Sequence, residues 1–176
     1  MIIIGIDPGY AITGFGVIEY TSNHFRTIDF GVISTKAGVP FELRLLAIYQ
    51  QLEALIVRYQ PDVMAVEELF FSKNTTTAIG TAQARGIIIL AGAKAGIPVY
   101  EYTPMQVKLA VTGYGLADKN QVGQMIKVLL HLDMAPKVDD ASDALAIAIC
   151  QAHTGLSNDN KAVGGYQYGW NGKNYS

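Results

Sequence analysis

The sequence predicts an α/β protein with a mixed five-stranded sheet, in which an antiparallel meander joins parallel strands, flanked by helices. Three β-favouring segments separated by short turns open the chain, which is typical of a meander. From residue 40 onward, helical periodicities alternate with short apolar strands, which favours parallel pairing and helices on the sheet. Half of the 176 residues are hydrophobic and only 16% are charged, which is enough to build a buried core and excludes a disordered chain.

The meander is predicted from the first 34 residues. Met1–Asp7 begins with four β-favouring apolar residues, and Pro8-Gly9 after it is typical of a turn. Thr13–Tyr20 and Phe25–Ser34 follow as strands two and three, with the polar Thr21–Asn23 between them as the connecting turn.

The remainder predicts helices that alternate with two further strands. Leucines recur at helical spacing from Pro40 to Tyr59, and Pro61 follows the end of that helix. The two strands are Val63–Glu67 and Ile97–Tyr102. The other predicted helices are Thr75–Ala95, Pro104–Val111, Lys119–Leu130 and about Asp140–His153.

The length of the chain favours one folded domain, which we place at residues 1–154. Residues 155–176 are rich in Gly, Asn, Ser and Tyr without periodicity, and we expect a loosely ordered polar tail there. No apolar run approaches the roughly 20 residues of a membrane span, and no secretory signal is readable at the N-terminus. The single cysteine, Cys150, cannot form an internal disulfide, which fits a cytoplasmic location.

The net charge of −2 does not by itself suggest a nucleic-acid partner, but the charge is unevenly distributed. Residues 1–72 carry 4 basic and 8 acidic side chains, whereas residues 73–137 carry 7 basic and 3 acidic ones. Residues 138–176 are acidic again. This pattern is compatible with a positive face beside a carboxylate cluster, although fluctuations of this size are common.

Four carboxylates stand where predicted elements end or begin. Asp7 and Glu67 close two strands, and they lie side by side if those strands are parallel neighbours. Asp140 and Asp143 share one face at the start of the last helix. Carboxylates that converge in this way suit Mg²⁺ or Mn²⁺, and two such ions can flank a phosphodiester.

Two of these positions, Asp7 and Asp140, also have a purely structural explanation. Asp7 before Pro-Gly could be a turn residue, and Asp139 or Asp140 could be a helix N-cap. Glu67 is harder to explain in this way, because a lone carboxylate at the end of a buried strand is costly.

The ordered set of motifs resembles the RuvC family of Holliday junction resolvases, which have a ribonuclease H-like fold. The resemblance covers about Met1–His153. Its motifs are Gly5–Gly9, Thr13–Val17, Ala65–Glu67, Lys73–Asn74, Gln83–Gly86, Gln106–Lys108, Lys119–Val122 and Asp140–Ala146. It implies a magnesium-dependent crossover junction endodeoxyribonuclease acting in DNA recombination and repair.

The resemblance implies that Asp7, Glu67, Asp140 and Asp143 are catalytic metal ligands for two Mg²⁺ ions, with Mn²⁺ as a possible substitute. Glu68 and Asp139 adjoin two of these positions. The family spacing selects Glu67 and Asp140, and strand alternation agrees for Glu67. Asp139 stays open, since it is four residues before Asp143 and could reach the same helix face.

The resemblance also implies DNA-binding roles for five residues of the central region: Phe70, Lys73, Arg85, Lys108 and Lys119. Phe70 would stack on a base near the crossover, while Phe71 would pack into the core. The alternatives are a hydrophobic anchor for the phenylalanines and ordinary solvated charges for the lysines. His24, His131 and His153 show no ligand spacing and receive no role.

A four-way junction with twofold symmetry calls for a homodimer that makes paired symmetric nicks. The small residues of the second predicted helix, Ala78, Gly80, Ala82, Ala84 and Gly86, would admit a partner helix, or equally a neighbour within the subunit. The resemblance adds the branch-migration proteins RuvA and RuvB as partners. Two other functions remain open: a YqgF-like nuclease of the same fold acting on RNA, and a junction protein that binds without cleaving. An actin-like ATPase needs a longer chain.

Overall fold

The fold is a mixed five-stranded sheet in the order β3-β2-β1-β4-β5. The structure is a computed structural model that describes residues 1–69, 75–134, 136 and 138–155. The strands are β1 (Ile2–Asp7), β2 (Ile12–Thr21), β3 (His24–Ser34), β4 (Val63–Glu67) and β5 (Val99–Tyr102). β1, β2 and β3 pair antiparallel, while β4 pairs parallel with both β1 and β5. The predicted meander and its parallel extension are therefore confirmed.

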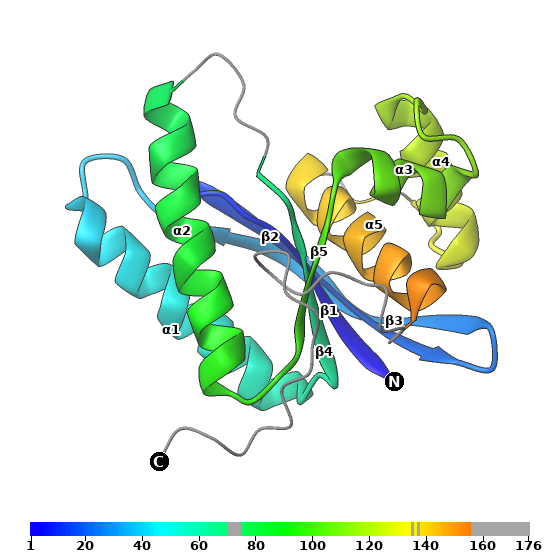
Figure 1. Cartoon of the computed structure of the whole chain (residues 1–176), viewed down its shortest axis with the longest axis horizontal. Helices are drawn as coiled ribbons and strands as arrows, with labels where there is room; N and C mark the ends of the chain where they lie inside the picture. The colour runs from blue at the N-terminus through cyan, green and yellow to red at the C-terminus, as the bar shows by residue number, and fades with distance from the viewer. Residues whose placement is uncertain (70–74, 135, 137, 156–176) are drawn as a thin grey trace.

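The five helices of the described residues form two layers, one on each side of the sheet (Figure 1). One layer holds α1 (Phe41–Tyr59) and α2 (Thr75–Lys94). The opposite layer holds α3 (Pro104–Thr112), α4 (Lys119–Leu129) and α5 (Asp139–Thr154). The predicted helices agree with these bounds to within one or two residues at each end.

Strand β5 begins two residues later than predicted, and the physical reason is Pro98. Gly96 ends the preceding helix with a φ of +70°, and the Ile97 amide still bonds back to the Gly92 carbonyl at 3.0 Å. Pro98 has no N–H to donate, although its carbonyl accepts a 2.9 Å hydrogen bond from Met64. Regular pairing with β4 therefore starts at Val99.

The alternation of side chains along the strands divides the core into two halves. In β1, Ile3 packs with α3, α4 and α5, while Ile4 and Ile6 pack with α1 and α2. In β4, Val63 and Ala65 belong to the same half of the core as Ile3. Met64 and Val66 belong to the other half, with Ile4 and Ile6. The residues that end these two strands, Asp7 and Glu67, thus have the parity of the α5 side.

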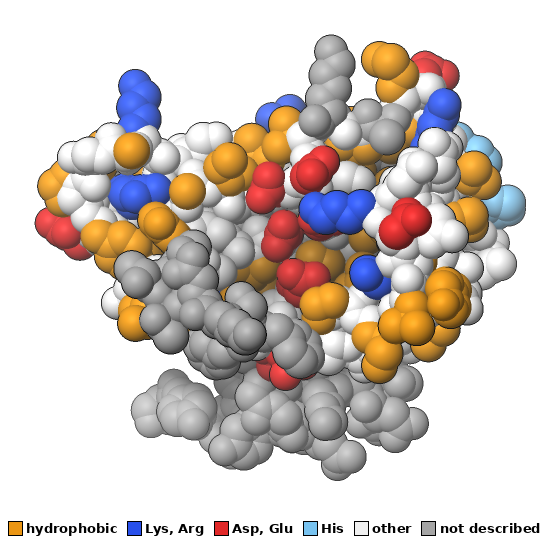
Figure 2. All heavy atoms as spheres, turned by 90° about the horizontal axis from the view of Figure 1, so that it is seen from above, with side chains coloured by type: hydrophobic (Ala, Val, Ile, Leu, Met, Phe, Trp, Pro, Cys, Tyr) orange, Lys and Arg blue, Asp and Glu red, His pale blue; other side chains and the backbone are white. Residues whose placement is uncertain are grey.

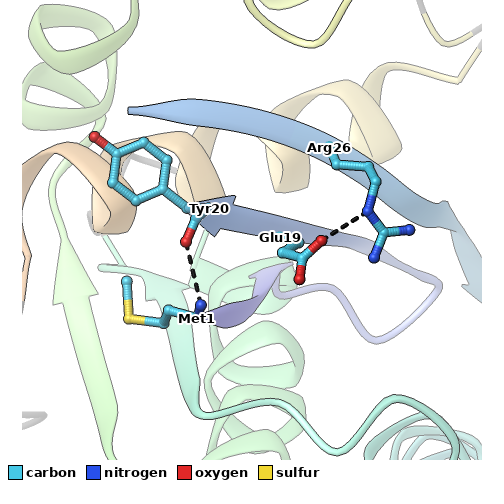
Figure 3. Close-up of polar contacts among 4 residues, drawn as sticks. All are labelled: Met1, Glu19, Tyr20 and Arg26. Carbon is cyan, nitrogen blue, oxygen red and sulfur yellow. Dashed lines mark hydrogen bonds and ion pairs between the residues drawn. The ribbon is translucent and has the colours of Figure 1, made fainter. Parts of the chain in front are cut away.

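The start of β1 is secured at the opposite end of the sheet (Figure 3). The Met1 amino group donates to the Tyr20 carbonyl at 3.1 Å, and the Tyr20 amide donates to the Met1 carbonyl at 2.9 Å. Arg26 and Glu19 pair across β2 and β3 at 2.7 Å. None of the helices within the described residues is both long and apolar enough to cross a membrane.

Candidate active site

Asp7 and Glu67 lie side by side at the carboxyl ends of β1 and β4. The two strands are parallel neighbours in a register that pairs Ile6 with Val66, so the next residues are matched as well. Both side chains are partly buried. The condition on which their meeting depends in the sequence, that these two strands are parallel neighbours, is therefore met, and the two carboxylates lie at the same end of the sheet.

Helix α5 brings two more carboxylates to the same edge because glycines let it lie directly on the sheet. A methyl group added to Gly14 would lie 2.0 Å from the Asp140 carbonyl oxygen, and one added to Gly5 would lie 2.2 Å from the Ala144 carbonyl oxygen. Only glycine permits such an approach of backbone to backbone. The first two turns of α5, with Asp140 and Asp143, are thereby held against the end of β1 and the start of β2. Figure 2 shows acidic side chains gathered on this face, with lysine or arginine side chains beside them.

The pKa values of the site carboxylates reflect both their burial and their proximity to one another. Burial, followed by the charges of Glu67, Asp143 and Asp140, raises the pKa of Asp7 to about 8. Burial, followed by the charge of Asp143, raises the pKa of Glu67 to about 7. Burial also raises the pKa of Asp143, against the opposing effect of Lys119. Without a cation, the fold therefore holds protons on groups that would otherwise ionise near pH 4.

Asp140, not Asp139, faces the Asp7 carboxylate. Asp140 is partly buried and contributes to the raised pKa of Asp7. The Asp139 side chain is 80% exposed and lies 3.5 Å from the Lys119 ammonium. Neither residue is the N-cap of α5, because Val138 occupies that position. The turn-residue explanation of Asp7 also lacks support, since no described residue hydrogen-bonds its carboxylate.

Two lysines lie beside the carboxylates around a hollow of about 280 Å³. Lys119 is the first residue of α4, and its ammonium lies 3.4 Å from the Asp143 carboxylate. Lys108 projects from α3 into the same lining. The remaining lining consists of Glu67 and Asp143 together with the apolar Pro104, Val107, Val122 and Ala146. The structure thus brings the two predicted lysines and two of the predicted carboxylates, Glu67 and Asp143, around one hollow.

The other predicted DNA-binding residues are placed differently or lie outside the described residues. Arg85 on α2 is 14% exposed and forms an ion pair with Glu101 of β5. Its Nε–H also donates to the Glu67 carbonyl at 3.3 Å. Phe70, Phe71 and Lys73 lie outside the described residues.

Sequence reasoning missed two features of the structure. Glu101, the partner of Arg85, was given no role, although the alternation of β5 places it on the side of Val99 and therefore of α2. The three histidines, which look scattered along the sequence, line one hollow at the far end of the sheet: His24, His131 and His153.

The donor set fits a hard divalent cation, since carboxylate oxygens are the ligands that Mg²⁺ and Mn²⁺ prefer. Burial and the neighbouring carboxylates raise the pKa values of Asp7 and Glu67, and a cation bound among them would favour their ionised forms. Within the described residues, no three Asp, Glu, His or Cys side chains are already close enough to share one ion. The four carboxylates converge on one region without yet forming a closed coordination shell.

The sheet order, and the carboxylates at the ends of β1 and β4 and the start of α5, define a ribonuclease H-like fold. Yeast mitochondrial Holliday junction resolvase Ydc2 shares this fold with a TM-score of 0.61 at 13% identity, over 86% of this chain and 78% of Ydc2. Thermus thermophilus RuvC in complex with a Holliday junction matches with a TM-score of 0.84 at 36% identity, over 88% of this chain and 94% of that one.

Sequence comparison gives the family. The family described as crossover junction endodeoxyribonuclease RuvC matches residues 3–151. RuvC of Alkaliphilus metalliredigens is 56% identical over 88% of this chain and 94% of its own length. RuvC of Desulforamulus reducens is 58% identical over 86% and 93%, respectively. The chain belongs to the RuvC family of crossover junction endodeoxyribonucleases.

Proposed function

We propose that this protein resolves Holliday junctions by hydrolysing one phosphodiester in each of two opposed strands. The observation that carries the proposal is the convergence of Asp7, Glu67, Asp140 and Asp143 beside two lysines, in a chain of the RuvC family. In each nick, a water oxygen bonds to phosphorus and the bond from phosphorus to the 3′ oxygen breaks. The products are a 5′-phosphate and a 3′-hydroxyl, which a ligase can rejoin.

The four carboxylates would hold the catalytic metal, which we take to be two Mg²⁺ ions with Mn²⁺ as a substitute. Bound divalent cations supply charge neutralisation and Lewis acidity to phosphodiester hydrolysis. In the metal-free protein, Asp7 and Glu67 retain protons because of burial and mutual repulsion. Metal binding must displace those protons, so metal affinity increases with pH across the neutral range.

Lys119 and Lys108 would bind the phosphates that flank the scissile bond. Lys119 is 73% exposed and its ammonium already lies within 3.5 Å of two carboxylates, so it can approach a phosphate bound at the same edge. Lys108 lines the adjoining hollow. Phosphate contacts of this kind give affinity without sequence selectivity.

We further propose that the protein is a homodimer that uses the outer face of α2. Ile79 and Leu90 are 60% and 54% exposed, and the exposed Gln83 and Gly86 lie between them at helical spacing. A side chain at Gly86 would meet nothing within 4 Å, so this face is open to a partner helix. Other small residues pack inside the subunit instead: Ala84 is fully buried, and Gly80 abuts Tyr10.

The dimer is tested by the oligomeric state of Leu90→Lys in analytical ultracentrifugation. Val57→Lys is the matched control, since Val57 is 70% exposed on α1. We expect Leu90→Lys to sediment as a monomer and Val57→Lys as a dimer. A dimeric Leu90→Lys protein would remove this face from the interface.

The remaining parts of the proposal come from the sequence and its resemblance. They are base stacking by Phe70, a phosphate contact by Lys73, partnership with RuvA and RuvB, a cytoplasmic location, and a nuclease domain that spans residues 1–154. Phe70→Ala should slow cleavage of an intact junction by about tenfold, from roughly 1–3 kcal/mol of lost stacking.

The proposed function is tested by cleavage of three labelled substrates: a synthetic four-way junction, a linear duplex and an RNA–DNA hybrid. We expect symmetric nicks in the junction with Mg²⁺, none with EDTA, and little cleavage of the other two. Preferred cleavage of the hybrid would favour the RNA-processing branch of the fold. Junction binding without cleavage in Mg²⁺ or Mn²⁺ would indicate a junction-binding protein that is not a nuclease.

A further inference from the structure

The backbone of Glu67 is held by a side chain from another layer of the molecule. Arg85 reaches from α2 to the end of β4, where its Nε–H donates to the Glu67 carbonyl at 3.3 Å. The next residue, Glu68, donates its amide to the Tyr102 carbonyl of β5 at 2.9 Å. Both backbone bonds lie at the point where β4 ends, directly at the carboxylate that we assign to the metal site.

The same arginine forms an ion pair with Glu101, and both side chains are only 14% exposed. Glu101 lies opposite Val66 in the pairing of β4 with β5, one residue before the level of Glu67. It has the parity of Val99, which faces α2. The carboxylate of Glu101 therefore fixes the guanidinium beneath the sheet edge, on the face opposite α5.

We propose that Arg85 is a positioning residue for Glu67, oriented by Glu101, and not a DNA contact. The inference rests on the proposed role of Glu67 as a metal ligand. Arg85 and Glu101 act from the α1–α2 side of the sheet, while the Glu67 carboxylate acts on the α5 side. Residues behind metal ligands orient them in this way, and their loss typically weakens metal affinity or activity by about 10–100-fold.

The exposure of Arg85 separates it from the lysines of the site. Lys119 is 73% exposed and free to follow a phosphate, whereas Arg85 is 14% exposed, and its donors point at the protein. A phosphate contact would require Arg85 to break its ion pair with the largely buried Glu101 carboxylate. Breaking a largely buried ion pair is unfavourable.

A positioning contact and a charge that acts only at long range predict opposite effects of Arg85→Gln on cation affinity. Removing a positive charge near a metal site strengthens cation binding if only long-range electrostatics act. Removing a positioning contact weakens it, because Glu67 is no longer fixed. The sign of the change therefore distinguishes the two.

The variants are Arg85→Gln, Glu101→Gln and the double variant that carries both. Arg85→Gln alone removes one partner of a largely buried ion pair, so we expect it to lower stability. The double variant removes both charges of this pair together. The matched control is Lys94→Gln. Lys94 is on α2 like Arg85, and its ion pair with Glu53 of α1 is well exposed on both sides.

The main readout is Mn²⁺ affinity of the DNA-free protein, measured by calorimetry or by loss of the free Mn²⁺ signal in electron paramagnetic resonance. We expect about 10–100-fold weaker Mn²⁺ binding in Arg85→Gln and in the double variant, and no change in Lys94→Gln. Thermal unfolding of the double variant should match the wild type. Junction binding in EDTA should also match the wild type in every variant.

Unchanged or tighter Mn²⁺ binding by a folded double variant would overturn the positioning role. Weaker junction binding in EDTA, with a salt dependence reduced by about one charge, would make Arg85 a DNA contact instead. Glu67→Gln separates the two levels of the argument. If it binds Mn²⁺ like the wild type, the ligand role of Glu67 fails, whereas if only the Arg85 variants behave normally, the positioning role alone fails.

Discussion

The carboxylates of the site and the lysines beside them are held in two different ways. Asp7 and Glu67 end buried strands, and Asp143 extends from a helix that rests on glycine. The lysines come from short helices whose starts are fixed by local caps, in which Thr103 pairs with Gln106 and Asp118 pairs with Gln121. The carboxylates thus lie where buried strands and backbone contacts fix them, while the lysines extend from helices whose first turns are also fixed by reciprocal hydrogen bonds at the surface.

This comparison indicates which part of the site is rigid. Long-range sheet pairing and backbone contact fix where negative charge accumulates, and burial makes that charge costly without a cation. The Lys119 ammonium is exposed and can move between carboxylate and phosphate without disturbing packing. Substitutions in the first group should therefore affect chemistry and stability, and those in the second should affect affinity and rate.

Asp7→Asn should produce the largest effect on the rigid part of the site. The amide keeps the volume of the carboxylate but loses the charge that holds a cation, so we expect cleavage to fall by about 1000-fold or more. Junction binding, measured by gel shift in Ca²⁺ or EDTA, should survive because phosphate contacts elsewhere carry it. Cleavage within tenfold of the wild type would remove Asp7 from the ligand set.

Asp140→Asn and Asp139→Asn should sharpen the boundary between the two regions. Asp140 contributes to the raised pKa of Asp7, whereas Asp139 lies out at Lys119, 80% exposed. We expect Asp140→Asn to cost about 100-fold or more in single-turnover cleavage, and Asp139→Asn to cost less than about threefold. The reverse order would mean that the Asp139 side chain turns inward when DNA and metal bind.

Lys119→Ala and Lys108→Ala should have smaller effects, which differ in kind. Each change should weaken junction binding and reduce the slope of log K against log salt by about one unit. Lys119→Ala should also slow cleavage at saturating DNA by roughly tenfold, because its ammonium lies at the carboxylates. A salt slope that stays at the wild-type value would make both lysines ordinary surface charges.

The smallest expected effect is on the stability of the metal-free protein. Because burial and repulsion raise the pKa of Asp7 to about 8, the folded protein holds a proton that the unfolded chain releases above about pH 4. The folded state then binds more protons, so the free energy of unfolding in EDTA decreases as pH rises from about 5 to 8.

Asp7→Asn removes this titration, so its melting temperature should fall less over the same pH range, by about 3–8 °C, and should exceed that of the wild type at pH 8. Melting curves in EDTA at pH 5, 6.5 and 8 measure it. Equal pH dependence in both proteins would show that Asp7 ionises normally in the fold.

Most of the fold could be predicted from the sequence because its signals are local. β-favouring apolar segments and turn residues defined the strands, and the φ values of +49° at Ser22 and +67° at Asn23 match the tight turn expected between β2 and β3. The ends of elements were also readable, apart from the start of β5, where Pro98 prevents pairing. Parallel pairing of β1 with β4 remains a condition at the level of the sequence, and the structure meets it, which brings Asp7 and Glu67 together.

The rest of the site depends on contacts between distant segments, which the sequence does not show. Which aspartate of the pair at 139 and 140 faces inward depends on how α5 lies on Gly14. Whether Arg85 faces DNA or protein depends on Glu101, which is 16 residues away and on another element. An arginine that contacts DNA and an arginine that contacts protein look the same in the sequence, and only the packing around the side chain distinguishes the two roles.

The most direct test of the central claim, that four carboxylates of β1, β4 and α5 form the metal centre, is a crystal structure soaked in Mn²⁺ with anomalous scattering recorded. We predict anomalous density coordinated by oxygens of Asp7, Glu67, Asp140 and Asp143, at roughly 2.0–2.3 Å from the ligands. Asp139 should stay outside this shell. Saturating Mn²⁺ that leaves this edge of the sheet without anomalous density, or that binds elsewhere while the four carboxylates stay apart, would contradict the account.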